Sequence, residues 1–188
     1  GSLVPTLIFC KAVWERMVTI NFAILGAGRI GQVHARAVAG NENAVLRAVA
    51  DPNSEAADAI ADRYGCDVRT INEIADSSDI DAVVICTPTD MHADLIEQFV
   101  RVKKAIFCEK PIDLDAARVR DCLDVVTAED GFLMVGFNRR FDPHFMAVRK
   151  AIDEGLIGTP EMAIITSRDP GAPPAEYIQR SGGIFRDM

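Results

Sequence analysis

The stretch VTINFAILGAGRIG, Val18 to Gly31, indicates the fold of the chain. It begins with apolar and β-branched residues, which are typical of a strand, and passes directly into three glycines, Gly26, Gly28 and Gly31. Their G-x-G-x-x-G spacing predicts a tight turn that opens a helix. Helical periodicity then continues to Gly40, and it places these residues on one predicted face: Ile30, Val33, His34, Ala37 and Val38.

Each glycine has its own physical purpose if the turn holds a dinucleotide. Gly26 permits the tight turn, Gly28 lets backbone N–H groups approach a pyrophosphate, and Gly31 lets the helix pack closely on the strand. Asp51 ends the next apolar run. Its carboxylate would accept hydrogen bonds from both adenosine ribose hydroxyls and would repel a 2′-phosphate, so we expect NAD as the cofactor.

Two residues near this turn allow a second interpretation. Asp51-Pro52 could simply start a turn. Arg29 could meet either the pyrophosphate or a 2′-phosphate, which keeps NADP open as the less favoured cofactor. We expect Arg29 and Ile30, which lie inside the glycine turn, to contact the cofactor together with the glycines.

The rest of the chain alternates short apolar runs with helical segments. Strands are predicted at 44–51, 66–69, 81–88, 105–108, 132–137 and 161–168, and helices at 54–64, 71–78, 91–102, 114–129 and 143–155. Ser54 is the predicted N-cap of its helix, and Gly65 the predicted stop. Repeated β-α-β units imply an α/β fold, a doubly wound parallel sheet of the Rossmann type. Residues 1–16 are interpreted as a leader or as residues left by cloning.

Two further predicted strands have candidate site residues at their carboxyl ends: Thr87-Pro88 end one strand, and Glu109-Lys110 follow the other. Ligands of open α/β sheets lie beyond the carboxyl ends of the strands. We therefore expect Glu109 and Lys110 in the cofactor crevice and Thr87 and Pro88 along it. His92, in the first turn of the next helix, is either a further cofactor contact or a helix cap.

Composition excludes several kinds of partner. The formal net charge of −8 argues against nucleic acid and anionic membranes, because binding to such surfaces needs clustered Lys and Arg, and it favours a small molecule. No run of apolar residues is long enough to span a bilayer. The five cysteines form no C-x-x-C pair and are expected as reduced thiols in the cytoplasm, and the three histidines are not spaced as metal ligands.

Six motifs together carry a resemblance to a known family: GAGRIG, VADP, CTPTDMHAD, CEKPIDLD, GFNRRFDP and SGGIFRDM. The chain resembles the Gfo/Idh/MocA oxidoreductases from about Val18 to Met188. The resemblance implies NAD-linked oxidation of a secondary alcohol of a cyclic polyol or sugar, with myo-inositol, oxidised to 2-keto-myo-inositol, as the expected substrate. Relatives that act on glucose, other polyols or amino sugars share most of these motifs.

The resemblance also implies roles for individual residues. Lys110 would lie near the nicotinamide and the reacting hydroxyl, where it could bind the substrate oxygen and relay a proton. Glu109 would fix Lys110 or the cofactor ribose, and the bond before Pro111 is often cis in relatives. Asn138 is a candidate substrate contact and Arg140 a candidate cofactor contact, although the arginine could instead be solvated.

A further part of the expected site lies near the end of the sequence. Asp187 matches the aspartate of a D-x-x-x-H element and is expected to bind substrate and help catalysis, and Asp169 is a weaker candidate for substrate contact. The histidine base of that element would follow Asp187 by four residues. We therefore expect a Rossmann domain at 17–137 and, at 138–188, the truncated start of an α+β substrate domain, in a fragment that binds NAD weakly and turns nothing over.

Two other functions compete with a dehydrogenase. A non-catalytic NAD-binding module would keep the glycines and Asp51 but would have no need of Lys110 or Asp187. A methyltransferase that uses S-adenosylmethionine also has a glycine-rich turn, but E-K-P has no role there. The resemblance further implies that the complete protein is a homo-oligomer, often a tetramer in the family.

Overall fold

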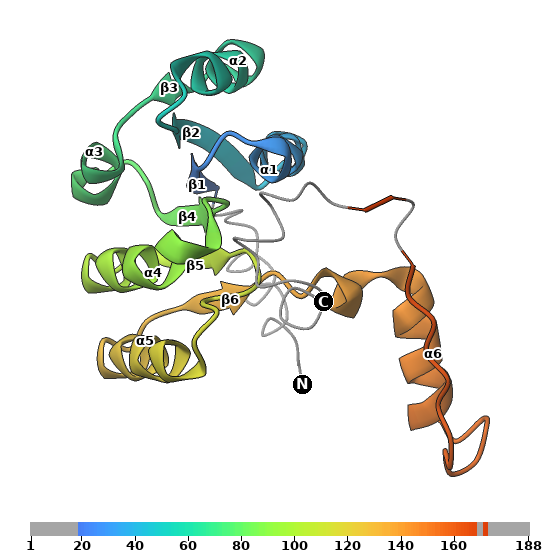
Figure 1. Ribbon diagram of the computed structural model, residues 1–188. Helices are drawn as coiled ribbons and strands as arrows, with labels where there is room; N and C mark the ends of the chain where they lie inside the picture. The colour runs from blue at the N-terminus through green and yellow to red at the C-terminus, as the bar shows by residue number, and fades with distance from the viewer. Residues whose placement is uncertain (1–18, 169–170, 173–188) are drawn as a thin grey trace, which may run out of the picture.

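The computed structural model describes residues 19–168 and 171–172, in which one six-stranded sheet carries helices on both faces (Figure 1). The strands are β1 (Ile20–Leu25), β2 (Ala44–Ala50), β3 (Asp67–Val68), β4 (Ala82–Ile85), β5 (Ala105–Cys108) and β6 (Leu133–Val135). The α-helices are α1 (Arg29–Ala39), α2 (Ser54–Tyr64), α3 (Ile71–Asp76), α4 (His92–Arg101), α5 (Ala116–Ala128) and α6 (Pro143–Asp153). The two 3-10 helices are η1 (Thr89–Met91) and η2 (Asn138–Phe141).

All neighbouring strands are parallel, and their order is β3-β2-β1-β4-β5-β6. The chain runs outward from β1 to β3, then returns to the other side of β1 and runs outward again from β4 to β6. This confirms the predicted doubly wound parallel sheet. Because the strands are parallel, their carboxyl ends share one edge, and the order reverses between β1 and β4.

Successive side chains of a strand point to opposite faces of the sheet, so the core has two layers. Ala23 and Leu25 of β1 pack with the helices α3, α4 and α5, whereas Ile24 packs on the opposite face with α1 and α2. All four residues of β4 are buried, as a central parallel strand covered on both faces requires. The candidate site is therefore carried by strands that are fixed from both sides.

Local capping explains where several helices begin and end. Asn53, and not the predicted Ser54, caps α2, because the Asn53 side chain accepts a hydrogen bond from Ala56 N. Gly65 ends the same helix in the left-handed conformation, with φ of 68°, as predicted. Thr70 and Glu73 form a reciprocal capping box at the start of α3.

The predicted face of α1 is partly wrong. Its buried residues are Gly31 and Ala35, whereas Val33 is 45% exposed and Ala37 is also exposed. The reason is the close approach of α1 to β1, which small residues permit and larger apolar residues would prevent. The apolar pattern alone pointed to a face rotated away from the actual contact.

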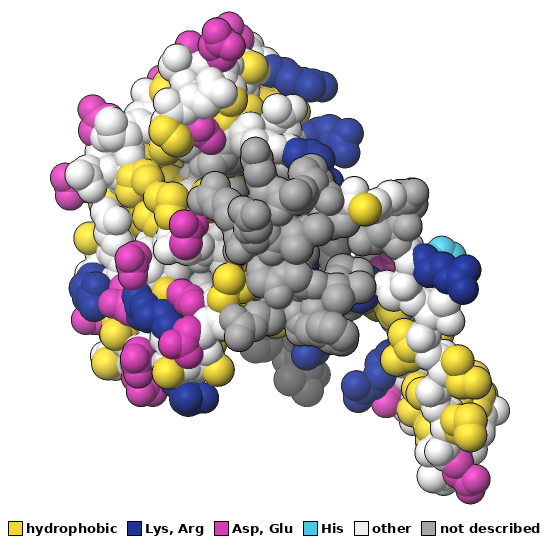
Figure 2. Space-filling view, in the orientation of Figure 1, with side chains coloured by type: hydrophobic (Ala, Val, Ile, Leu, Met, Phe, Trp, Pro, Cys, Tyr) yellow, Lys and Arg dark blue, Asp and Glu magenta, His cyan; other side chains and the backbone are white. Residues whose placement is uncertain are grey.

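The predicted strand at 161–168 is also wrong. Within the described part of the chain, this segment pairs with no strand, and Met162, Ile164 and Ile165 are exposed. A strand forms only where a neighbouring backbone completes its hydrogen bonds, however apolar its own sequence is. The preceding helix α6 extends away from the sheet, has no buried residue, and displays apolar side chains along its surface (Figure 2).

Candidate functional site: a nucleotide-binding edge

The turn between β1 and α1 is held by two glycines that the fold itself requires. Gly26 has φ of +99°, and a Cβ there would lie 2.7 Å from the carbonyl carbon of Cys86. A Cβ on Gly31 would lie 1.9 Å from the backbone oxygen of Gly26. Any side chain at either position would therefore force β1, β4 and α1 apart.

Gly28 differs, because nothing in the described residues explains a glycine there. Its φ is −65°, which any residue adopts, and a Cβ would meet no atom within 4 Å. No side chain caps the start of α1, and its first turn carries no acidic residue. The open space above Gly28 and the uncapped amides suit a pyrophosphate, which binds at helix N-termini.

Asp51 joins the end of β2 to the glycine turn. Its Oδ2 accepts a hydrogen bond from Ala27 N at 2.6 Å, and its Oδ1 accepts one from Asn53 N at 2.7 Å. The second bond is the turn that we considered as an alternative, and the first shows that the carboxylate also fixes the nucleotide-binding turn. Each carboxylate oxygen can accept a further bond, so ribose hydroxyls could still be bound.

The two candidate residues after β4, Thr87 and Pro88, differ in exposure to solvent. Thr87 Oγ1 is buried and has no hydrogen-bond partner within the described residues, which is unusual and suits a ligand contact. Pro88 is exposed beside it. Thus this loop offers a polar group at the edge where the sheet order reverses.

His92 is placed differently from our expectation. The residue is only 2% exposed, and its Nδ1 and Nε2 lie 2.7 Å from Pro111 O and 2.8 Å from Thr87 O. Both ring nitrogens thus face backbone carbonyls, which only accept hydrogen bonds, so both contacts are hydrogen bonds when each nitrogen carries a proton, and neither nitrogen is left for a cofactor. It does not cap α4 with its side chain either, since Met91 is the N-cap residue and no side-chain bond caps the helix.

Glu109 is paired with a residue that sequence reasoning gave no functional role. His34 Nε2 of α1 lies 2.7 Å from Glu109 Oε1, with 22% and 24% of the two side chains exposed. The imidazole also contacts the Phe107 ring, at 5.0 Å between centroids. The signal available in the sequence was the position of His34, one helical turn after Gly31, but its partner is 75 residues away.

The surroundings of Glu109 keep it ionised. Burial opposes its negative charge, but the hydrogen bond and charge of His34, with smaller contributions from Lys110, outweigh burial and hold the pKa of Glu109 below its ordinary value. Gly136, after β6, leaves room for it, since a Cβ there would lie 3.2 Å from the Glu109 carboxyl carbon. In turn, burial and the charge of Glu109 raise the pKa of the Cys86 thiol to about 12.

Lys110 follows Glu109 directly and is half-buried at the same edge. The bond between Lys110 and Pro111 is cis, as the resemblance implied. Arg29 and Ile30 begin α1, and Asn138 and Arg140 lie exposed in η2, after β6. The predicted site residues Asp169 and Asp187 lie outside the described residues.

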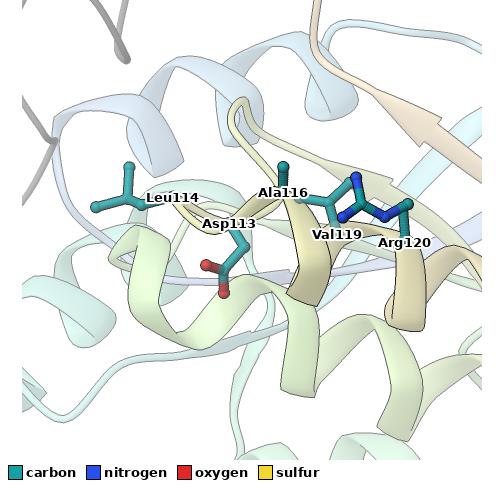
Figure 3. A pocket seen from close by; sticks show the side chains of 5 residues that line it. All are labelled: Asp113, Leu114, Ala116, Val119 and Arg120. Atoms are coloured by element: carbon teal, nitrogen blue, oxygen red, sulfur yellow. The ribbon is translucent and has the colours of Figure 1, made fainter.

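Three other kinds of feature in the described residues could form a site: thiols, metal ligands and surface hollows. The four cysteines in the described residues are free thiols, and no group of three or more His, Cys, Asp or Glu among those residues could hold a metal ion. A surface hollow of about 390 Å³ opens at the start of α5 and contains none of the candidate site residues (Figure 3). It is lined by Asp113, Leu114, Ala116, Val119 and Arg120. No helix in the described part of the chain is long and apolar enough to cross a membrane.

The parallel sheet, the glycine turn and the acidic residue after β2 define a dinucleotide-binding protein of the Rossmann class. The sequence matches the family described as "Oxidoreductase family, NAD-binding Rossmann fold" over residues 20–137, and the chain belongs to this family, the Gfo/Idh/MocA oxidoreductases. This confirms the family resemblance of the sequence.

Individual relatives are inositol dehydrogenases. Inositol 2-dehydrogenase of Rhizobium meliloti (strain 1021) is 71% identical over 171 residues, which are 91% of this chain and 52% of that protein. The crystal structure of a myo-inositol dehydrogenase from Corynebacterium glutamicum is similar with a TM-score of 0.85 and 44% identity, over 90% of this chain and 51% of that one.

A third similar structure contains ligands. It is scyllo-inositol dehydrogenase from Lactobacillus casei with bound NAD(H) and scyllo-inositol, with a TM-score of 0.71 and 30% identity, over 74% of this chain and 42% of that one. The chain therefore spans about half the length of the relatives that it matches.

Proposed function

We propose that this chain is the cofactor-binding part of an NAD-dependent dehydrogenase, and that the complete protein oxidises myo-inositol to 2-keto-myo-inositol. The observation that carries the proposal is the shared edge of the sheet. The open Gly28 turn, the Asp51 carboxylate and Lys110 all follow strands that end on that edge. The three relatives support the substrate class, since each name contains inositol.

Different residues of this edge would hold different parts of the cofactor. The turn Gly26–Gly31, including Arg29 and Ile30, would hold the pyrophosphate, and Asp51 the adenosine ribose. Thr87, with its unpartnered hydroxyl, and Pro88 would line the path toward the nicotinamide. Arg140 is a further proposed contact of the cofactor.

NAD is proposed over NADP because of the charge at Asp51. The Asp51 carboxylate would repel the 2′-phosphate of NADP. It cannot easily move away, because Ala27 N and Asn53 N hold it in place. The Lactobacillus casei relative, whose structure contains NAD(H), supports the same choice. Arg29 is the residue whose positive charge would favour the 2′-phosphate of NADP.

In the proposed reaction, bound NAD would supply the hydride acceptor, and the protein would have to take the proton of the hydroxyl as the alcohol becomes a ketone. Lys110 would donate a hydrogen bond to the substrate oxygen and relay the departing proton. Glu109 holds the backbone before Lys110 through its pair with His34. Asn138, Asp169 and Asp187 are proposed substrate contacts, Asp187 also with a catalytic role, and residues from 138 onward are proposed to begin the substrate domain.

The proposal is tested with the full-length protein, by NADH formation from myo-inositol, scyllo-inositol and glucose, with NAD and with NADP. We expect turnover with an inositol and NAD. Lys110→Ala should lower kcat by roughly 10²- to 10⁴-fold while NAD affinity stays within a few fold.

Lys103, at the opposite end of the same strand β5, provides a matched control. Its φ is 60°, a conformation that asparagine tolerates, and Lys103→Asn should leave turnover unchanged. Full turnover by Lys110→Ala would refute the role of Lys110, and no turnover of any polyol by the wild type would refute the proposed reaction.

A further inference from the structure

A buried histidine connects two loops of the proposed site. The ring of His92 lies between Thr87 O, after β4, and Pro111 O, after β5, at 2.8 and 2.7 Å. Such a buried polar ring persists only where its nitrogens find partners. Here both partners belong to the backbone of segments that carry proposed site residues.

The His92 ring connects the loops after β4 and β5 beyond the point where the hydrogen bonds of the sheet end. β4 and β5 are joined by backbone bonds up to the one from Glu109 N to Ile85 O, at 3.0 Å. The two loops then leave the sheet, and Lys110 and Thr87 lie beyond that last bond. His92 bonds the carbonyl next to Lys110 and the carbonyl of Thr87 itself.

We propose that His92 is a positioning residue for the hydride-transfer site, which rests on the dehydrogenase function proposed above. With a proton on each ring nitrogen, the ring donates to both loops and sets the position of the Lys110 amine relative to the Thr87 hydroxyl, so that both meet one bound cofactor and substrate. Reaction rates fall steeply when reacting groups are misplaced by as little as an ångström, so such a connection controls kcat. The support is rigid because His92 begins α4, which lies beside the sheet (Figure 1) and whose buried side chains belong to the core.

Two substitutions separate the two bonds. The amide nitrogen of asparagine is as many bonds from the backbone as Nδ1 of histidine, and that of glutamine as many as Nε2. His92→Asn thus retains a donor toward Pro111 O and loses the one toward Thr87 O. His92→Gln retains the donor toward Thr87 O and loses the one toward Pro111 O.

The expected results are different for the two variants of the full-length protein. His92→Gln, which releases the Lys110 loop, should lower kcat by at least about tenfold and change the KM for NAD by less than about threefold. His92→Asn, which releases the Thr87 loop, should raise the KM for NAD more than it lowers kcat. His144→Gln, at an exposed histidine of α6, should change neither constant.

A purely structural role for His92 would lower melting temperature in both variants without separating kcat from KM. That result, or kinetic constants within twofold of the wild type in both variants, would overturn the proposal. Amide hydrogen exchange gives a measurement that does not depend on turnover. We expect faster exchange around Ile112 in His92→Gln and around Thr89 in His92→Asn, and unchanged exchange in both would overturn the positioning role even if the wild type had no dehydrogenase activity.

Discussion

His34 Nε2 lies 2.7 Å from Glu109 Oε1, and this pair joins the helix that follows the glycine turn to the residue that precedes Lys110. The two ends of the proposed site are thereby connected across the sheet, from β1 through β4 to β5. Phe107 packs against the imidazole and shields the pair from one side. Substitutions at this pair should affect both stability and the geometry of the site.

The first prediction concerns the pH dependence of that pair. The pKa of Glu109 is lower in the folded protein than in the unfolded chain, so the unfolded chain binds more protons between the two values. The stabilisation is complete above the unfolded value, about 4.3, and is lost as pH falls through the folded value. Glu109→Gln should therefore be less stable than the wild type at neutral pH, and the difference should shrink in acid.

Urea unfolding of both proteins between about pH 7 and pH 3 measures this difference. If the Glu109→Gln difference stayed constant down to the lowest pH, the His34 pair would not control the ionisation of Glu109.

The second prediction separates the two kinds of glycine in the turn. Gly28→Ala should leave the free energy of unfolding unchanged or raise it by about 0.4–1 kcal/mol, because its backbone conformation is compatible with alanine. It should nevertheless weaken NADH binding at least about tenfold, because the new methyl group occupies the space proposed for the pyrophosphate. Fluorescence titration with NADH, beside thermal unfolding, measures both.

Gly31→Ala is the opposite case and serves as the comparison. The added Cβ would lie 1.9 Å from Gly26 O, so we expect a loss of about 1–3 kcal/mol in unfolding free energy. Equal NADH binding by Gly28→Ala and the wild type would show that no ligand approaches Gly28.

The third prediction concerns cofactor choice. Asp51→Asn removes the negative charge but retains an oxygen for one of its two amide partners. We expect NADH to bind more weakly and NADPH more tightly, so that the preference for NADH falls by about tenfold or more. Dissociation constants for both dinucleotides provide the measurement.

Asp81 is the matched control for that carboxylate. It also accepts a bond from a backbone amide, that of Asn21 at 2.8 Å, but it lies at the amino end of β4. Asp81→Asn should reduce stability and leave the cofactor preference unchanged. A preference that Asp51→Asn does not alter would mean that Asp51 fixes the turn without meeting the ribose.

The fourth prediction compares two adjacent lysines. Lys104 is 9% exposed, and its Nζ donates to the carbonyls of Ser77 and Ile80 at 2.5 and 2.9 Å. Lys104→Met leaves both carbonyls without this donor and should lower the free energy of unfolding by about 1–3 kcal/mol. Lys103, whose side chain is 64% exposed in a pair with Glu129, should give a smaller loss on the same substitution. Equal losses in urea unfolding would contradict the assigned role of Lys104.

Patterns close together in the sequence were sufficient for much of the fold. The glycine spacing after β1, the continuous apolar run of β4 and the stop at Gly65 each depend on neighbouring residues, and the structure confirms all three. The parallel sheet follows from the alternation of strands and helices along the chain, because each helix must return the chain to the same end of the sheet. The cap of α2 lies one residue before the predicted Ser54, because the Asn53 side chain reaches Ala56 N.

Tertiary structure decided the partners of the polar side chains. His34 meets Glu109 only because β5 lies two strands from β1, and His92 is buried only because the loops after β4 and β5 meet over it. The segment 161–168 has a strand-like composition, yet it pairs with no strand in the described part of the chain, because pairing is a property of two segments. Local residue order thus determined the family, the sheet and the nucleotide-binding turn, whereas distances between residues remote in sequence had to come from the packed fold.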